Sequence, residues 1–93
     1  MNYLSVTEVQ HFLDQLAPMQ EFAVVFTKKD GTQRAFAGYL HPANPEKRLD
    51  NVPVVTEDGV KSFNRGRVMW IGWPDQAQQV INLMAGFHPH ETA

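Results

Sequence analysis

The stretch Ser62–Pro74, SFNRGRVMWIGWP, decides how this sequence folds. It starts apolar, breaks at the polar and glycine residues Asn64–Arg67, and becomes strongly apolar again before Gly72–Pro74 ends it. Short runs rich in aromatic and β-branched residues are typical of buried strands. We therefore interpret this stretch as two strands joined by a single helical turn over residues 64–67.

Two further strands are predicted on either side of Asp30-Gly31, at residues 22–27 (FAVVFT) and 32–40 (TQRAFAGYL). An Asp-Gly pair between apolar runs predicts a type I′ hairpin, because both central residues of that turn need a positive φ. Gly38 lies inside the second of these strands and predicts a bulge or a sharp bend.

After a loop at 41–51, two more strands are predicted at residues 52–57 and 60–63, separated by the Asp58-Gly59 turn. Pro53 has no amide hydrogen to donate to a ladder, so it places the start of its strand on a sheet edge. Together with residues 68–71, the sequence predicts five short antiparallel strands.

Amphipathic helices are predicted at both ends of the chain. Ser5 and Glu8 have the spacing of a capping box, which starts a helix over residues 5–17 that Pro18 ends. Its apolar stripe comprises Val6, Val9, Phe12, Leu13 and Leu16. A second helix is predicted over 75–86, with Gly86 just past its end. Its apolar stripe comprises Ala77, Val80, Ile81, Met84 and Phe87.

These elements predict a mainly β fold with flanking helices (α+β), in which a small five-stranded SH3-like or Sm-like barrel is formed by residues 22–71. The whole chain, residues 1–93, is expected to be one domain, with a tail at 88–93 after the second helix. Gly38 and the 64–67 turn are the expected corners of the barrel. The two arginines of that turn should point into water from the barrel rim, while Phe63 and Val68 return to the core.

The charge is unevenly distributed, although the 93 residues carry a formal net charge of only −2. All eight Lys and Arg residues lie between Lys28 and Arg67, and the segments outside are acidic. The chain has no cysteine. No segment approaches the roughly 20 apolar residues that span a bilayer, and the first residues lack the basic start and apolar run of a secretory signal. We therefore expect a cytoplasmic protein that does not bind membranes.

At this level of detail the sequence resembles a known family. FTKKDGTQRAFAGYL at 26–40, followed by a loop and then VKSFNRGRVMWIG at 60–72, resembles short bacteriophage and plasmid proteins with a WYL-related, Sm-like SH3 barrel. The resemblance covers residues 22–71. It implies that fold and a phage-like origin, and hence the host cytoplasm as location, and it implies no catalytic residues. The short middle loop and the well-formed second helix depart from the family.

The sequence offers no catalytic set, and we expect no enzymatic activity. Ser5 is explained as a helix cap, and Ser62 lies in a strand without a nucleophile motif around it. His88 and His90 are the best metal candidates, but zinc sites take three or four protein ligands. No glycine-rich phosphate loop is present. We therefore predict neither a metal nor another cofactor.

The predicted binding residues are the basic side chains of the first hairpin and the last strands, with one amide and one tryptophan beside them. They are Lys28, Lys29, Arg34, Lys61, Asn64, Arg65, Arg67 and Trp73. Most aromatic residues lie on predicted core faces. Trp73 stands at an element boundary, where it can be an exposed contact residue or can clamp the second helix onto the barrel.

Two function hypotheses follow. In the first, a non-enzymatic binding protein of phage or mobile-element type docks on another protein, such as a host factor, as an adaptor or inhibitor. In the second, an oligomeric Sm-like protein binds nucleic acid or nucleotides through its basic rim. Three phosphate contacts would give a non-specific Kd of about 10⁻⁴ M, so the second hypothesis needs a ring or dimer. A structural or assembly role, and a basic rim that is merely solvated, remain open alternatives.

Overall fold

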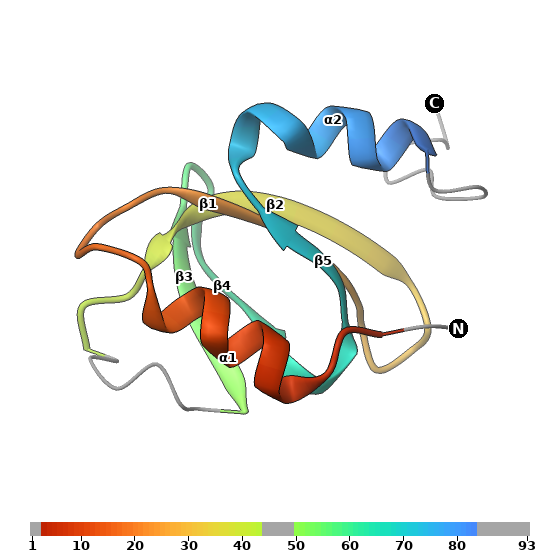
Figure 1. Cartoon of the computed structure of the whole chain (residues 1–93), viewed down its shortest axis with the longest axis horizontal. Coiled ribbons are helices and arrows are strands. Elements are labelled where there is room, and N and C mark those ends of the chain that lie inside the picture. The colour runs from red at the N-terminus through yellow and green to blue at the C-terminus, as the bar shows by residue number, and fades with distance from the viewer. Residues whose placement is uncertain (1–2, 44–49, 84–93) are drawn as a thin grey trace.

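The computed structural model describes residues 3–43 and 50–83. The elements follow one another in the order shown in Figure 1: α1 (Val6–Asp14), β1 (Phe22–Thr27), β2 (Gln33–Leu40), β3 (Asn51–Thr56), β4 (Gly59–Asn64), the 3₁₀ turn η1 (Arg65–Arg67), β5 (Val68–Gly72) and α2 (Pro74–Leu83). The mainly β prediction is therefore confirmed, and so is the helical turn between the last two strands.

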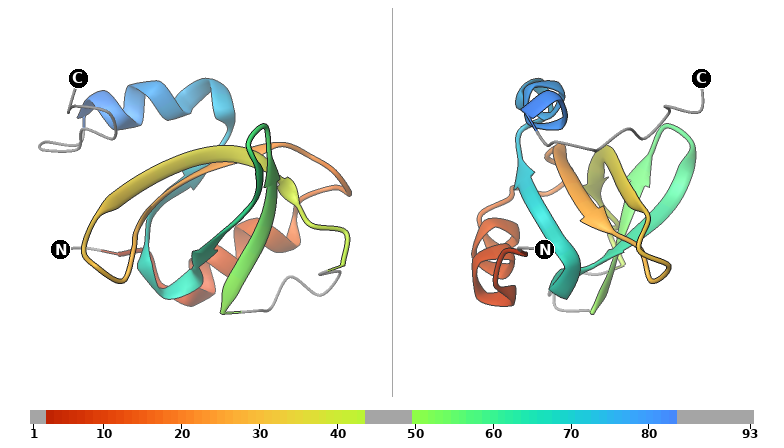
Figure 2. Two further views of the ribbon diagram at one scale, coloured as in Figure 1. Left: turned by 180° about the vertical axis from the view of Figure 1, so that it is seen from behind. Right: turned by 90° about the vertical axis from the view of Figure 1, so that its right-hand side faces the viewer.

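All five strands form one antiparallel sheet in the order β4-β3-β2-β1-β5. Within the described residues the sheet does not close, because β4 and β5 remain its two edges. It is strongly curved, and η1 joins the two edge strands at one end (Figure 2). The curvature gives the sheet a concave side that holds the core.

Gly38 permits the bend in β2, as the sequence predicts. β1 pairs with β2 as far as Gly38, and β3 pairs with β2 from Tyr39 onward. A Cβ atom on Gly38 would overlap with the carbonyl oxygen of Val55, so only glycine lets the two backbones come this close. This close approach allows β2 to change partners within one residue.

The α1 helix begins as predicted but is shorter at its C-terminal end. The Ser5 hydroxyl accepts from the Glu8 amide and the Glu8 carboxylate accepts from the Ser5 amide, both at 3.0 Å. The helix ends at Asp14 and not at residue 17, because the amide of Leu16 donates to Leu13 three residues back and the last turn tightens. Leu16 stays in the core, only 5% exposed.

The first residue of the predicted apolar stripe of α1 is placed differently. Val6 is 45% exposed and does not join the core. Leu4 packs against the core from the segment before the helix, and its amide donates to the carbonyl of Val68 in β5 at 2.8 Å. The rest of the α1 face, with Val9 and Leu13 fully buried, joins side chains from β1, β3, β4 and β5 in one core.

The first hairpin is not type I′. Gly31 has a φ of 88°, but Asp30 has no positive φ. The Gly31 amide donates to Lys28 and the Lys28 amide donates to Thr32, which gives a three-residue loop ending in a left-handed glycine. The Asp30 carboxylate accepts from the Thr32 amide at 2.9 Å, and this local bond favours the observed turn.

The predicted edge position of Pro53 is also wrong, because β3 lies between β2 and β4. Pro53 pairs with Ser62 on the β4 side. On the β2 side the registered pairs end at Leu40, and the carbonyl of Pro53 accepts from the His41 amide at 3.1 Å. The missing amide hydrogen of Pro53 thus falls where the β2 ladder ends, which explains how an interior strand accommodates proline.

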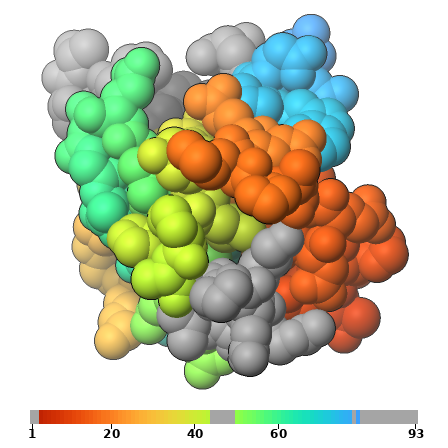
Figure 3. Space-filling view, turned by 90° about the vertical axis from the view of Figure 1, so that its left-hand side faces the viewer, coloured from red at the N-terminus to blue at the C-terminus, as the bar shows by residue number. Residues whose placement is uncertain are grey.

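The α2 helix starts at Pro74, one residue earlier than predicted, with proline in the favoured first helical position. It lies against β1 and β5, away from α1, and the chain after α1 passes between the two helices (Figure 3). The stripe positions from Val80 onward, the predicted end at Gly86 and the tail lie outside the residues whose side chains are described. No helix in the described segments has the length and apolar character needed to cross a bilayer.

Candidate anion-binding site

Two strands, β2 and β4, and the last residues of β1 with the residue that follows it carry the same short pattern near the first hairpin and η1. Each has a phenylalanine and, two positions away, a cationic residue: Phe26 with Lys28, Phe36 with Arg34, and Phe63 with Lys61. Side chains two apart in a strand lie on the same face. The three rings contact one another with centroids 5.3 to 6.5 Å apart. The pattern therefore sets three cations beside one cluster of aromatic rings.

Two adjoining hollows lie at this end of the sheet. The first, about 220 Å³, is lined by Lys28, Arg34 and Lys61 together with Phe26 and Phe36. The second, about 240 Å³, has Lys28, Lys29 and Arg67 in its wall, with Asn64. The two share Phe26, Lys28 and Ser62, and among the described residues neither has a carboxylate in its lining. We call the two hollows and their five cations the anion-binding face.

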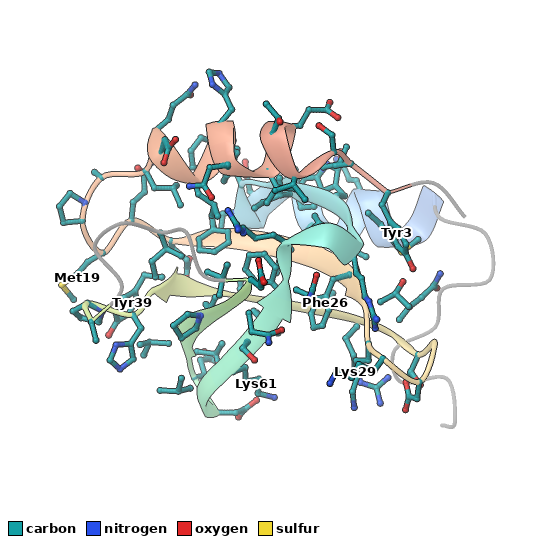
Figure 4. All side chains as sticks on the ribbon, turned by 90° about the horizontal axis from the view of Figure 1, so that it is seen from below. Tyr3, Met19, Phe26, Lys29, Tyr39 and Lys61 are labelled. Carbon is teal, nitrogen blue, oxygen red and sulfur yellow. The ribbon has the colours of Figure 1, made fainter. Side chains whose placement is uncertain are left out.

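The cations of the anion-binding face are not neutralised by partners within residues 3–43 and 50–83. None of Lys28, Lys29, Arg34, Lys61 and Arg67 forms an ion pair there. Figure 4 shows Lys29 and Lys61 on the side of the molecule away from α1, and in this view Phe26 lies nearer to α1 than either lysine. A ligand that reaches this face meets five cations that form no ion pair in the described part of the chain, although the charges of Lys28 and Arg34 interact with Asp30.

Asp30 is the acidic residue of the adjacent hairpin loop. Hydrogen bonds from the side chain and the amide of Thr32 lower the pKa of its carboxyl group, and the charges of Lys28 and Arg34 lower it slightly further. Asp30 therefore stays ionised at neutral pH and offsets part of the positive charge near the hairpin, but it lines neither hollow.

Arg65 does not belong to this face, and the prediction that it points into water is wrong. Its side chain is only 14% exposed, and Nη2 lies 3.2 Å from Asp50 Oδ1. Nη1 donates to the buried Gln10 of α1 at 2.6 Å, and the Arg65 amide donates to the Asp50 carbonyl at 2.9 Å. Arg65 thus ties η1 to α1 and to the start of β3, on another side of the molecule.

The remaining two predicted residues have structural contacts. Asn64 caps η1, because its side-chain oxygen accepts from the Gly66 amide at 2.8 Å, and it also lines the second hollow. Trp73 is 41% exposed, and its ring packs on Phe12 of α1 with centroids 5.2 Å apart. Trp73 is therefore partly exposed and at the same time packed against α1, and it lines neither hollow.

Sequence reasoning missed that core phenylalanines also line the site. The sequence predicts core faces for most aromatic residues, Phe26, Phe36 and Phe63 included, and Phe26 is indeed only 6% exposed. The signal is present in the sequence as FTK, RAF and KSF, three strand segments in which a cation stands two residues from a phenylalanine. Strand periodicity alone places these pairs on common faces.

The described part of the chain contains no group of three His, Cys, Asp or Glu side chains that could hold a metal ion. His11 is engaged with Gln15 at 2.7 Å, and His41 accepts from the Ala43 amide. The predicted candidates His88 and His90 lie outside the described residues.

The chain matches no family model, no curated protein and no solved structure.

Proposed function

We propose that this protein is a non-enzymatic nucleic-acid-binding protein that uses its anion-binding face to contact phosphates. The observation that carries the proposal is the gathering of five cations around two hollows: within residues 3–43 and 50–83 these cations have no ion-pair partner and no carboxylate lines the hollows. Phosphate groups are strongly acidic, regularly spaced ligands for such a cluster. Of the two function hypotheses, the second is therefore the one that the geometry favours.

The fold on which we place this function is an SH3-like, Sm-like barrel of phage or mobile-element type. Three features support the assignment: the meander from β1 to β4, the 3₁₀ turn before the last strand, and the pairing of that last strand with β1. A cytoplasmic location, in the host if the protein is phage-encoded, is part of the same proposal.

Charge arithmetic sets the expected strength of binding. Five phosphate contacts give a salt slope of about −3.5 for a single strand and about −4.5 for a duplex. The sequence analysis assumed three phosphate contacts. With five cations on one face, we expect one subunit to bind more tightly than the Kd calculated for three contacts. The acidic residues outside 22–73 still oppose it, and an oligomer with several such faces would bind more tightly.

The test is a titration of labelled oligonucleotides at several salt concentrations, with light scattering to measure the mass of the protein in the same buffers. We expect affinity to fall steeply with salt, with a slope between about −2 and −4.5. Undetectable binding at low salt, or binding that salt does not change, would falsify the proposal.

Docking on another protein, as an adaptor or inhibitor, is the second candidate. The observation that favours it is Trp73, which is 41% exposed beside Phe12 where α2 begins. Tryptophan is enriched among the residues that contribute most to protein interfaces. A pull-down in which Trp73→Ala releases a specific protein, while loss of the basic residues does not, would favour this candidate over nucleic acid.

A further inference from the structure

We infer that the outer edge of β4 binds an extended, acidic segment of a partner protein, which adds a strand to the sheet alongside the two hollows. This ligand is a polypeptide, so the inference goes beyond the proposed function. Because the added strand and nucleic acid need the same cations, the partner protein is expected to displace nucleic acid from this face.

The two hollows lie between β4 and the hairpin that joins β1 to β2. Residues 61–64 of β4 line one side, and residues 26–29 and 34–36 of the hairpin line the opposite side. β1 pairs with β5 only as far as Phe26, so within the described residues the end of β1 has no strand beside it there. Figure 4 shows Lys61 of β4 and Lys29 of the hairpin on the same side of the molecule. The hollows therefore lie along an opening between β4 and the hairpin.

The backbone of β4 has hydrogen-bonding groups that point away from β3. The amide of Arg65 donates to the carbonyl of Asp50 at 2.9 Å, in register with the β3–β4 ladder. Backbone groups of successive residues in such a ladder alternate between the two sides of the strand, so those of Val60 and Ser62 point outward. These outward groups form no hydrogen bond within residues 3–43 and 50–83. An added strand can pair with both residues through their amides and carbonyls.

The other edge of the sheet, β5, is less accessible than β4. The amide of Leu4 donates to the carbonyl of Val68 at 2.8 Å, and α1 packs against β5. On β4, by contrast, Val60 is 60% exposed and offers apolar surface that an added strand would cover. Of the two edges, β4 is therefore the one that can accept a further strand.

The charge beside β4 selects an acidic strand. Five cations line the two hollows and form no ion pair in the described segments: Lys28, Lys29, Arg34, Lys61 and Arg67. Side chains of an extended strand alternate between its two faces, so carboxylates on one face can reach these cations while small apolar residues lie on the other. A second copy of this chain lacks the complementary charge, because neither β4 nor β5 carries a carboxylate. The occupant is therefore an acidic segment of a different protein.

The first test is a titration of a labelled heptapeptide, in which Glu and Val alternate, followed by fluorescence anisotropy. We expect binding that weakens as salt is added, and no binding of a matched peptide in which Lys replaces every Glu. Binding of both peptides, or of neither, overturns the inference. Nucleic acid is absent from this titration, so failure of the peptide leaves the proposed function intact.

Backbone methylation distinguishes strand addition from attraction between charges alone. Two further peptides keep every carboxylate but carry N-methyl groups either on the Val nitrogens or on the Glu nitrogens. Only one edge of an added strand pairs with β4, so one peptide should lose at least about tenfold in affinity, and the other should bind within about twofold of the unmodified peptide. Equal affinities of the two methylated peptides would mean that no strand is added.

Ser62→Pro and Ser62→Ala are a matched pair of variants of the protein. Proline removes the outward amide hydrogen at position 62 and leaves the bonds of β4 to β3 in place. It should weaken peptide binding about threefold to tenfold, the size of one main-chain hydrogen bond, whereas alanine removes only the hydroxyl and should bind as the wild type does. Urea unfolding checks that both variants fold. An equal loss in the two folded variants, or no loss with proline, contradicts the pairing; if the proline variant does not fold, the methylated peptides decide.

Competition with nucleic acid completes the test. Unlabelled acidic peptide should displace a labelled oligonucleotide from the protein, and the lysine peptide should not. An oligonucleotide that stays bound at saturating acidic peptide places the peptide elsewhere, and the inference is then wrong. If the peptide experiments succeed but no oligonucleotide binds, the proposed function fails and the inference stands.

Discussion

Arg65 and Arg67 lie two residues apart in η1 and differ in their partners: the side chain of Arg65 is bonded to other side chains, and that of Arg67 forms no ion pair in the described residues. Arg65 lies on the α1 side, where Gln10 accepts from its Nη1 and Asp50 accepts from its Nη2. Arg67 lines the second hollow on the anion-binding face and has no ion-pair partner in residues 3–43 and 50–83. The two arginines show that charge in the sequence does not separate a structural cation from one that the described part of the fold leaves without an ion-pair partner. The partners that the fold brings to each of them do.

The largest expected effect is a loss of nucleic-acid affinity when cations of the anion-binding face are removed. Changing Lys28, Arg34 and Lys61 together to Gln removes three phosphate contacts, so the salt slope for a single strand should become about 2 units shallower. Affinity near 0.1 M salt should then fall roughly 100-fold. Urea unfolding should show little change in stability, because these side chains form no ion pairs within the described residues. A large loss of stability would show that they are structural.

The second effect concerns Arg65 and is expected in stability. Arg65→Ala leaves the buried Gln10 oxygen without its donor, and should cost about 1 to 3 kcal/mol in the free energy of unfolding. Arg65→Lys should not restore stability, because lysine lacks the planar fork that reaches Gln10 and Asp50 together. Urea titration of both variants measures this. Full rescue by lysine would mean that only the charge matters at this position.

Arg67→Ala is the matched change on the anion-binding face, and it should lower the free energy of unfolding less than Arg65→Ala does. Arg67→Ala should alter the free energy of unfolding by no more than about 0.5 kcal/mol, as for most surface substitutions. Its expected effect is a salt slope shallower by about 0.7 for a single strand, the share of one phosphate contact. Here Arg67→Lys should restore the slope. If Arg65→Ala instead shows this slope change without losing stability, the assignment of the two arginines is reversed.

The smallest expected effect is on the pKa values of two carboxyl groups, Glu8 on α1 and Asp30 beside the anion-binding face. The pKa of Glu8 on α1 is lowered by its bonds with Ser5, and that of Asp30 by its bonds with Thr32. Both carboxylates therefore stabilise the fold above the pKa values of the unfolded chain, and this contribution is lost as the pH falls through about 4 and below.

In the triple Gln variant the pKa of Asp30 should be slightly higher than in the wild type, because Lys28 and Arg34 contribute to its lowering. Carboxyl NMR titration measures this change. The pKa of Glu8 should not move, because its lowering comes from the capping box. A shift in both residues would indicate a change of fold.

Local signals account for the part of the structure that the sequence predicts. The capping box, the strands at 22–27 and 68–71, and the helical turn at 64–67 depend on residues near one another in the chain. The strand periodicity of two places Arg34 and Lys61 on the faces of Phe36 and Phe63, whereas Lys29 comes from the hairpin loop and Arg67 from η1. Arg65 could not be assigned in this way, since its partners Gln10 and Asp50 lie 55 and 15 residues away. The hairpin type was missed because the Asp30 side chain bonds its own turn.

In the described part of the chain β4 is an edge strand, and this has a consequence for handling the protein. An edge strand offers unpaired amide and carbonyl groups to other chains, and a lysine on such a strand opposes that pairing. Val60, 60% exposed, and Lys61 both lie on this strand. Any variant that removes the charge of Lys61 therefore also removes a barrier to aggregation, and such variants should be compared at low protein concentration.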